Sequence, residues 1–140
     1  MQTNIKLVFT LLIVLSASVQ AGDSTKPEDA VNAYIKGVST GSGKHVMQAF
    51  SDTAFIQYYN QDAQYQHFSR DEFAKVVDNG QNWDAKIEIT NMLITGNAAN
   101  ATVNFTWGEK SEHGYVDYLN LLYDGENWHI TNKVAQYIER

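Results

Sequence analysis

The sequence predicts an α+β domain in which about three helices come first and a run of antiparallel strands follows. In three segments, residues 31–38, 46–50 and 73–77, the apolar residues recur every three or four positions, which is the period of a helix face. From Trp83 onward they alternate with polar residues, which is the period of a strand. Asp124-Gly125 lies between the last two apolar runs and predicts a closing β-hairpin. This order favours helices packed on one face of a curved sheet.

The first residues have the composition of a signal peptide. Lys6 precedes an apolar run over residues 7–15, and Val19 and Ala21 fit a signal-peptidase site. We therefore expect residues 1–21 to be cleaved, the protein to be exported (periplasmic or secreted), and residues 22–140 to form one domain. The apolar run is too short to span a bilayer comfortably, which disfavours the alternative of an uncleaved anchor. The sequence has no cysteine, which excludes a lipoprotein anchor and disulfide bonds.

The helices have start and stop signals at the expected places. Pro27 suits the first position of the first helix, Gly41 ends it, and Ser42 begins a second, short helix. Ser69 and Glu72 form a capping box, which gives the third helix the clearest local signal. The apolar faces are Val31, Tyr34, Ile35 and Val38 in the first helix, Val46, Met47 and Phe50 in the second, and Phe73, Val76 and Val77 in the third.

Strands are expected on both sides of the third helix. Residues 54–59 and 65–68 are aromatic and β-prone and predict a short strand pair. Two longer strands, around 87–90 and 101–107, flank Gly96-Asn97, and the hairpin around Asp124-Gly125 closes the chain. The hairpin is aligned by pairing Tyr123 with Trp128, Leu121 with Ile130, Leu119 with Asn132 and Asp117 with Val134. Asp117 and Asn132 then lie on the concave face, and Tyr118 and Lys133 lie outside; a slip of one residue would bury Lys133 among leucines.

These elements, in this order, resemble the nuclear transport factor 2-like fold, a cone-shaped α+β barrel. The segments Asp117-Tyr-Leu-Asn-Leu-Leu122, Asp124-Gly125 and Trp128-His-Ile-Thr-Asn-Lys133 resemble the bacterial group labelled putative lumazine-binding. The resemblance implies a pocket between the helices and the concave face of the sheet, often in a homodimer. The superfamily includes ketosteroid isomerases, polyketide cyclases, dehydratases and non-catalytic binding or association domains, so the fold does not fix the function.

Asp117 is the candidate catalytic residue. Burial disfavours the charged form of a carboxylate, so a buried Asp117 could serve as an acid, a base or a ligand anchor. The alternative is an acid at a strand end that is solvated or bonded to the backbone. A residue such as His67 is more often a half-buried histidine, and one such as Trp107 more often a core residue, than a ligand contact. The candidate pocket residues are Tyr34, Tyr58, Tyr59, His67, Trp107, Tyr115 and Asn132.

The remaining observations restrict the class of function. A net charge of -6 argues against nucleic acid or an anionic membrane as a partner. The histidines lack the spacing of a metal site, and no motif calls for a cofactor. The leading interpretation is therefore an exported, non-catalytic domain that binds a small apolar or aromatic molecule and forms a homodimer through its sheet. One alternative is a cofactor-independent isomerase, dehydratase or cyclase with Asp117 as general base. The other is a structural or association module whose cone is filled by its own side chains.

Overall fold

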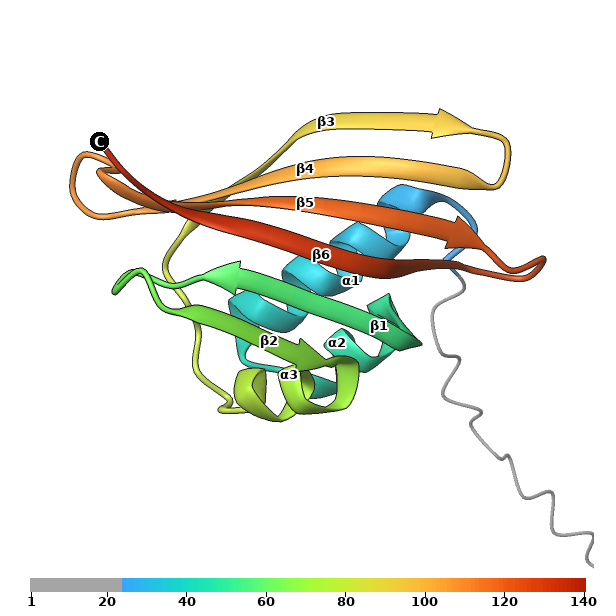
Figure 1. The fold of residues 1–140 in the computed structure, drawn as a ribbon, viewed down its shortest axis with the longest axis horizontal. Coiled ribbons are helices and arrows are strands. Elements are labelled where there is room, and N and C mark those ends of the chain that lie inside the picture. Colours follow the sequence, from blue (N-terminus) through green and yellow to red (C-terminus); the bar gives the residue numbers. More distant parts are fainter. Residues whose placement is uncertain (1–23) are drawn as a thin grey trace, which may run out of the picture.

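The computed structural model describes residues 24–140, so the expected signal peptide lies outside the described residues. Figure 1 shows the elements along the chain. The helices are α1 (Pro27–Thr40), α2 (Gly43–Ala49) and α3 (Arg70–Val77). The strands are β1 (Phe50–Tyr59), β2 (Tyr65–Ser69), β3 (Lys86–Thr95), β4 (Ala98–Trp107), β5 (His113–Tyr123) and β6 (Trp128–Glu139).

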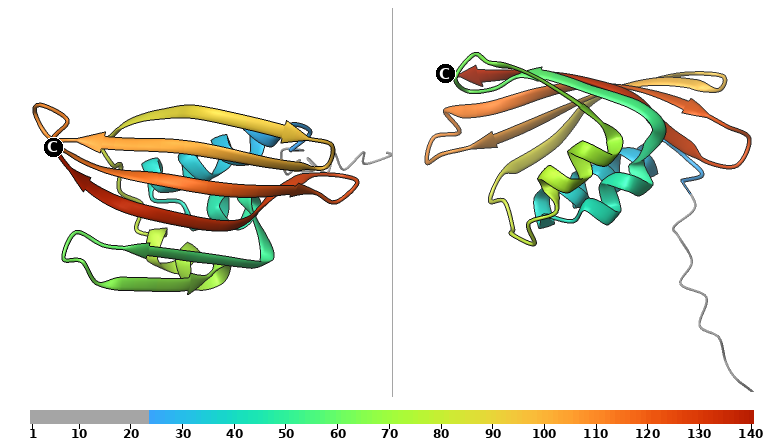
Figure 2. Two further views of the ribbon diagram at one scale, coloured as in Figure 1. Left: turned by 45° about the horizontal axis from the view of Figure 1, so that its top comes forward. Right: turned by 60° about the horizontal axis from the view of Figure 1, so that its bottom comes forward.

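The six strands form one open, curved sheet, and the three helices lie beneath the same face of it (Figure 2). The strand order is β2-β1-β6-β5-β4-β3. This arrangement confirms the α+β class and the helices packed on a curved sheet. The sheet is mixed rather than wholly antiparallel, because β1 pairs with β6 in parallel. These two strands are separated by most of the domain, so no tight hairpin forces them to run in opposite directions.

Gly41 and Ser69 end and begin helices as the sequence predicts. Gly41 ends α1 in the left-handed conformation, with a φ of 63°, which a glycine adopts without steric cost. At the start of α3 the backbone N–H of Ser69 donates to the Glu72 carboxylate at 2.8 Å, and the Ser69 hydroxyl accepts from the Glu72 backbone N–H at 3.4 Å. The capping box therefore fixes the point at which β2 turns directly into α3.

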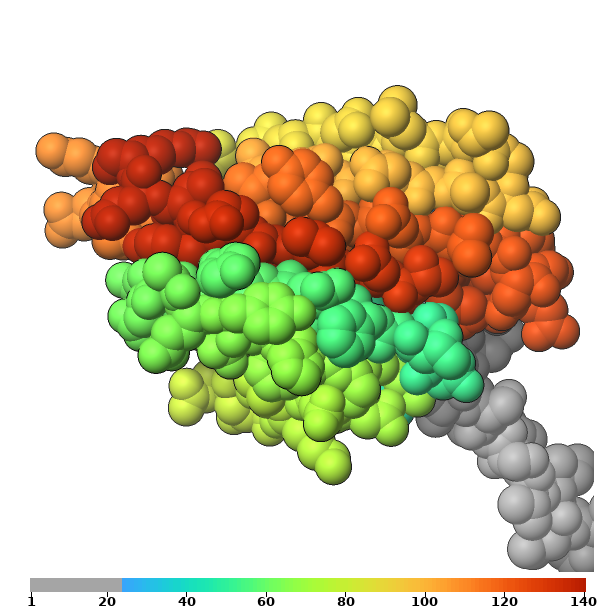
Figure 3. Space-filling view, in the orientation of Figure 1, coloured from blue at the N-terminus to red at the C-terminus, as the bar shows by residue number. Residues whose placement is uncertain are grey.

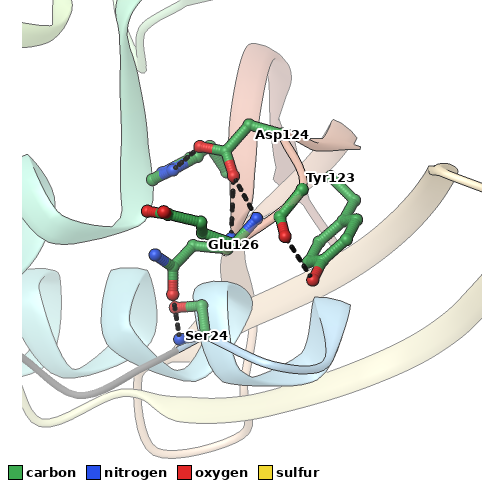
Figure 4. A network of polar contacts seen from close by, with 7 residues as sticks. Ser24, Tyr123, Asp124 and Glu126 are labelled. Atoms are coloured by element: carbon green, nitrogen blue, oxygen red, sulfur yellow. Dashed lines mark hydrogen bonds and ion pairs between the residues drawn. The ribbon is translucent and has the colours of Figure 1, made fainter.

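The β5–β6 turn is held by a polar network that also contacts the beginning of the described chain (Figure 4). One oxygen of the Asp124 carboxylate accepts from the backbone N–H groups of Glu126 and Asn127, each at 2.8 Å. The Ser24 N–H donates to Asn127 Oδ1 at 3.0 Å, and the Ser24 carbonyl accepts from the Trp128 N–H at 2.9 Å. The chain is thus tied to this turn just before α1 begins.

The hydrophobic core lies between the helices and the inner face of the sheet. Ala101, Val103 and Phe105 alternate along β4 with half-buried polar residues, which is the period that the sequence predicts. Leu119 and Leu121 of β5 continue the same inner face. No helix within residues 24–140 is long and apolar enough to cross a membrane.

The β5–β6 pairing follows the predicted register only near the turn. Tyr123 pairs with Trp128 and Leu121 with Ile130, as expected, but the next pair is Asn120 with Asn132. Thr131 is therefore the extra residue of a β-bulge, and beyond it the two faces of β6 are exchanged. The predicted pairs Leu119–Asn132 and Asp117–Val134 are wrong; the partners are Lys133 and Ala135.

Candidate functional site

A cavity of about 370 Å³ lies between α1, α3 and the inner face of the sheet. Its wall is mostly aromatic and aliphatic, and the amide side chains come from the segment that follows α3. The lining residues are Tyr34, Val38, Tyr58, Phe73, Val76, Val77, Asn79, Gln81, Asn82, Trp83, Phe105, Tyr115, Asp117, Lys133 and Ala135. A volume of this size suits a small organic molecule.

Three buried polar side chains meet at the inner wall of this cavity. Lys133 Nζ lies 3.0 Å from Asp117 Oδ2, and these side chains are only 8% and 1% exposed. Lys133 Nζ also donates to the Tyr34 hydroxyl at 2.6 Å, and that hydroxyl donates to Asp117 Oδ2 at 2.5 Å. The Tyr34 hydroxyl is thus hydrogen-bonded to both charged groups, which form an ion pair with each other. Asp117 Oδ1 is buried and has no hydrogen-bond partner among the described residues.

The aromatic wall completes the surroundings of the ammonium group. Lys133 Nζ lies 4.9 to 5.6 Å from the ring centroids of Tyr34, Tyr58 and Phe73, within the range of cation–π attraction. The Tyr34 ring packs edge-on against Phe50, with the centroids 5.3 Å apart. Pairing with a carboxylate, together with these rings, is what makes a buried lysine tolerable here.

The β6 bulge is the local reason that this network forms. Without Thr131 as an extra residue, strand alternation would carry Lys133 to the outer face, together with His129. With the bulge, Lys133 pairs with Leu119 and lies one row from Asp117 on the inner face. Asp117 and Val103 are paired across β5 and β4, so the carboxylate is on a central strand of the sheet. Tyr34 reaches both groups from the middle of α1.

Three tyrosines of the cavity have perturbed acidity. Burial, followed by the charge of Asp117 and the hydrogen bond to it, raises the pKa of Tyr34 well above its usual value. Burial and then the charge of Asp117 also raise the pKa of Tyr58. For Tyr115, burial is again the main cause of the raised pKa. All three therefore remain neutral phenols at physiological pH and can act as hydrogen-bond donors.

The structure brings four of the predicted site residues together at the cavity: Tyr34, Tyr58, Tyr115 and Asp117. Trp107 lies on the same face of the sheet but does not line the cavity. Its ring centroid lies 5.3 Å from that of Trp83 and 5.9 Å from that of Tyr115, and both of these residues do line the cavity. It contacts the wall of the cavity from outside.

Three of the predicted pocket residues lie on the opposite face of the sheet. Tyr59 is half exposed and packs on Tyr65, and the exposed His67 stacks on Phe55. Both follow strand alternation, because their neighbours Tyr58 and Phe68 occupy the inner face. Asn132 accepts from the Asn120 side chain at 2.8 Å on the outer face, because the bulge precedes it. Its predicted contact with Asp117 on the concave face is therefore wrong.

Sequence reasoning missed Lys133, Trp83 and Phe73 as cavity residues. Lys133 is the important omission, because a regular hairpin places it outside. The sequence of β6 gives no signal of the bulge, because the apolar residues Val134 and Ile138 continue the even-numbered series of Trp128 and Ile130. Only the structure shows that the inward residues change to Lys133 and Ala135 beyond Thr131. Trp83 lies before β3, and the strand alternation expected from there onward does not indicate that its ring reaches the cavity.

No group of three or more histidine, aspartate or glutamate side chains in the part of the chain that the structure describes could hold a metal ion. The polar groups at the cavity are one ammonium, one carboxylate, three phenols and the amides of Asn79, Gln81 and Asn82. Such a set can bind and orient a ligand by hydrogen bonds, and it can move a proton only if the carboxylate is released from Tyr34 and Lys133.

Comparison with known proteins identifies the family. The family model described as "Putative lumazine-binding" matches residues 23–136. The chain belongs to this family. The match spans both sides of the cavity, including α1, α3 and the β5–β6 hairpin with its bulge. No curated protein sequence matches the chain significantly.

Solved structures of the nuclear transport factor 2-like superfamily share the fold. A protein of unknown function from Shewanella baltica superposes with a TM-score of 0.70 at 22% identity, covering 81% of this chain and 92% of that one. Another, from Methylobacillus flagellatus, has a TM-score of 0.64 at 27% identity and covers 83% and 98%. A ketosteroid isomerase-like protein from Erwinia carotovora has a TM-score of 0.63 at 15% identity and covers 81% and 94%. The predicted superfamily is confirmed.

Proposed function

We propose that this protein is an exported, non-catalytic domain that binds a small, flat, largely apolar molecule in the cavity. The observation that carries the proposal is the aromatic-walled cavity of about 370 Å³ against the buried Lys133–Asp117–Tyr34 network. Apolar walls with a few convergent polar groups are the usual composition of small-molecule sites. The open cavity also supports a binding domain over a structural module filled by its own side chains.

The family description gives a first ligand to test. Lumazine is a flat bicyclic ring, and the rings of Trp83, Phe105 and Tyr115 along the cavity offer surfaces on which such a ring can stack. Trp83 and Phe105 are themselves stacked, with centroids 5.4 Å apart and planes at 11°. We therefore expect flat heteroaromatic compounds, lumazine among them, to bind more tightly than aliphatic compounds of the same size.

Calorimetric titration of a panel of flat heteroaromatic compounds tests the proposal. Trp83→Ala should weaken binding about tenfold, because it removes one stacking surface from the cavity. Tyr59→Ala is the matched control: it removes an aromatic ring that is half exposed on the outer face and should leave affinity unchanged. Equal affinities in Trp83→Ala and the wild type, or no binding across the panel, would contradict the proposal.

A second candidate is a cofactor-independent isomerase, dehydratase or cyclase in which Asp117 is the general base. Its support is the placement of Asp117 at the cavity, together with the ketosteroid isomerase-like protein among the solved structures of this fold. Two observations count against it: Asp117 Oδ2 already accepts from Tyr34 and is ion-paired with Lys133, and Oδ1 is buried. If any bound compound is turned over, Asp117→Asn should abolish the reaction; unchanged turnover would eliminate Asp117 as the base.

Export and dimerisation belong to the proposal as well. Ser24, a short way beyond the expected cleavage after Ala21, is bonded to the β5–β6 turn, so a chain cleaved there would keep this contact. The N-terminal sequence of protein recovered from the periplasm or medium tests the cleavage. The outer face of the sheet, which lies on the side away from the helices in Figure 2, is the surface through which we propose that two copies associate.

A further inference from the structure

The cavity has a balanced charge, and this restricts what can bind in it. Lys133 and Asp117 are the only charged residues in its lining, and they neutralise each other at 3.0 Å. A carboxylate ligand would therefore add an uncompensated negative charge beside Asp117, and an ammonium ligand would add a positive charge beside Lys133. Binding would remove either charge from water and place it against an aromatic wall. This desolvation costs free energy, and no unpaired charge of opposite sign in the lining compensates for it.

Lys133 and Tyr58 each have a hydrogen-bond donor with no acceptor among the described residues. An ammonium group has three N–H donors, and Lys133 donates one of them to Tyr34 Oη, whereas its contact with Asp117 Oδ2 is an ion pair. At least one N–H therefore has no protein acceptor within residues 24–140. The Tyr58 hydroxyl, on a ring whose centroid lies 5.6 Å from Lys133 Nζ, also makes no hydrogen bond to the described residues. Its raised pKa, caused first by burial and then by Asp117, keeps it a neutral donor.

The same network has no acceptor to offer a ligand. Asp117 Oδ2 accepts from Tyr34 and is paired with Lys133, and Oδ1 is not accessible to solvent. The Tyr34 hydroxyl accepts from Lys133 and gives its single proton to Asp117. A ligand group that meets this part of the wall therefore finds two unused donors, from Lys133 and Tyr58, and no exposed acceptor of the network. That pattern complements one oxygen with two lone pairs.

We infer that the ligand presents an uncharged carbonyl oxygen to Lys133 and Tyr58, as a ketone, quinone, lactone or lactam does, and not a carboxylate or an ammonium group. The inference rests on the proposed binding function and assigns the chemical class of the polar end of the ligand. A carbonyl oxygen accepts both donors and leaves the charge of the cavity balanced.

Four probes that share one ring system test the inference in the wild-type protein. They are 1-ethylnaphthalene, 1-acetylnaphthalene, 1-naphthoate and 1-(aminomethyl)naphthalene, titrated by calorimetry at neutral pH. The acetyl compound should bind about threefold to tenfold more tightly than the ethyl compound, because it gains hydrogen bonds at the same shape. It should also bind at least about tenfold more tightly than the naphthoate or the amine, whose charges are not compensated.

The outcomes separate the two proposals. If 1-naphthoate or the amine binds as tightly as 1-acetylnaphthalene, or if the ethyl compound does, the carbonyl assignment is wrong while binding in the cavity stands. If none of the four probes binds, the proposed function and the inference that rests on it both fail. The comparison uses one folded protein, so no substitution can obscure it.

Tyr58→Phe then identifies the donor. The substitution removes only a hydroxyl that has no protein partner, so the fold should be retained, which circular dichroism checks. Affinity for 1-acetylnaphthalene should fall about threefold to tenfold, and affinity for 1-ethylnaphthalene should not change. Tyr59→Phe, the same substitution on the outer face, should alter neither value. An equal loss for both probes, or no loss for either, would exclude Tyr58 as a carbonyl donor.

Discussion

Tyr34 is the residue on which the buried charge pair most depends. Its hydroxyl accepts from Lys133 Nζ and donates to Asp117 Oδ2, so it satisfies a buried cation and a buried anion at once. Its ring is fully buried against Phe50 and Phe105. The same side chain thus belongs to the core and to the wall of the cavity.

Tyr34→Phe should lower the free energy of unfolding by about 1–3 kcal/mol, because the ring is kept while two buried charged groups each lose a hydrogen bond. Urea denaturation at neutral pH measures the change. Tyr59→Phe is the control, because the Tyr59 side chain is half exposed and its hydroxyl makes no hydrogen bond to a described residue; its effect should be close to zero. Equal effects of the two substitutions would contradict the role assigned to the Tyr34 hydroxyl.

The raised pKa of Tyr34 also indicates how the free energy of unfolding should respond to alkaline pH. Burial and Asp117 raise the pKa of Tyr34 in the folded state, whereas in the unfolded chain a tyrosine ionises near pH 10. The folded protein therefore keeps a proton that the unfolded chain releases. The free energy of unfolding should fall as the pH rises above about 10, by up to about 1.4 kcal/mol per pH unit from this group. Tyr34→Phe should make that decline shallower, and parallel declines would show that Tyr34 does not cause it.

At the scale of secondary-structure elements, the capping box of α3 helps to position residues that line the cavity. Its cap turns the chain directly from β2 into a short helix, which places Phe73 and Val77 on the cavity. An eight-residue helix is marginal by itself, so its cap and its packing must hold it. Hydrogen bonds from Ser69 lower the pKa of Glu72, which keeps the carboxylate of the capping box ionised.

Ser69→Ala should lower the free energy of unfolding by about 1 kcal/mol, because it removes the side-chain cap of α3. Ser51→Ala is a matched control: the Ser51 hydroxyl in β1 is buried and has no hydrogen-bond partner among residues 24–140, so its removal should be neutral or stabilising. Chemical denaturation of both variants measures the difference. A Ser51→Ala variant that is as destabilised as Ser69→Ala would contradict this interpretation of the cap.

The elements also show what the sequence could and could not predict. Periodicity and the Ser69 box identify the helices and strands because both are local properties, and the first two rungs of the β5–β6 hairpin follow from its turn. The bulge at Thr131 is different. Its effect is to bring Lys133 to Asp117, which depends on contacts with Tyr34 in α1, far away in the chain. Local patterns favoured the regular register, so the charge pair at the cavity was missed.

At the scale of the whole molecule, the two faces of the sheet differ in what covers them. The helices cover the inner face, whereas the outer face of β1, β6 and β5 is open (Figure 3). That open face carries large apolar side chains: Phe55, Tyr118 and Val134 are each between 43% and 50% exposed. Tyr118 and Val134 are direct cross-strand partners, so their side chains form one patch rather than isolated contacts.

Such a patch supports association of two copies through their sheets, and Tyr118→Glu should disrupt it. A charge at this position would be buried without a partner in a dimer, but solvated in a monomer, where Tyr118 is half exposed. Sedimentation velocity over a range of concentrations should show a dimer for the wild type and a monomer for Tyr118→Glu. Met47→Glu, which adds the same charge at an exposed methionine of α2 on the helical side, should remain dimeric. The proposed dimer surface on the outer face would be wrong if the wild type stays monomeric at high concentration, or if Met47→Glu dissociates as fully as Tyr118→Glu.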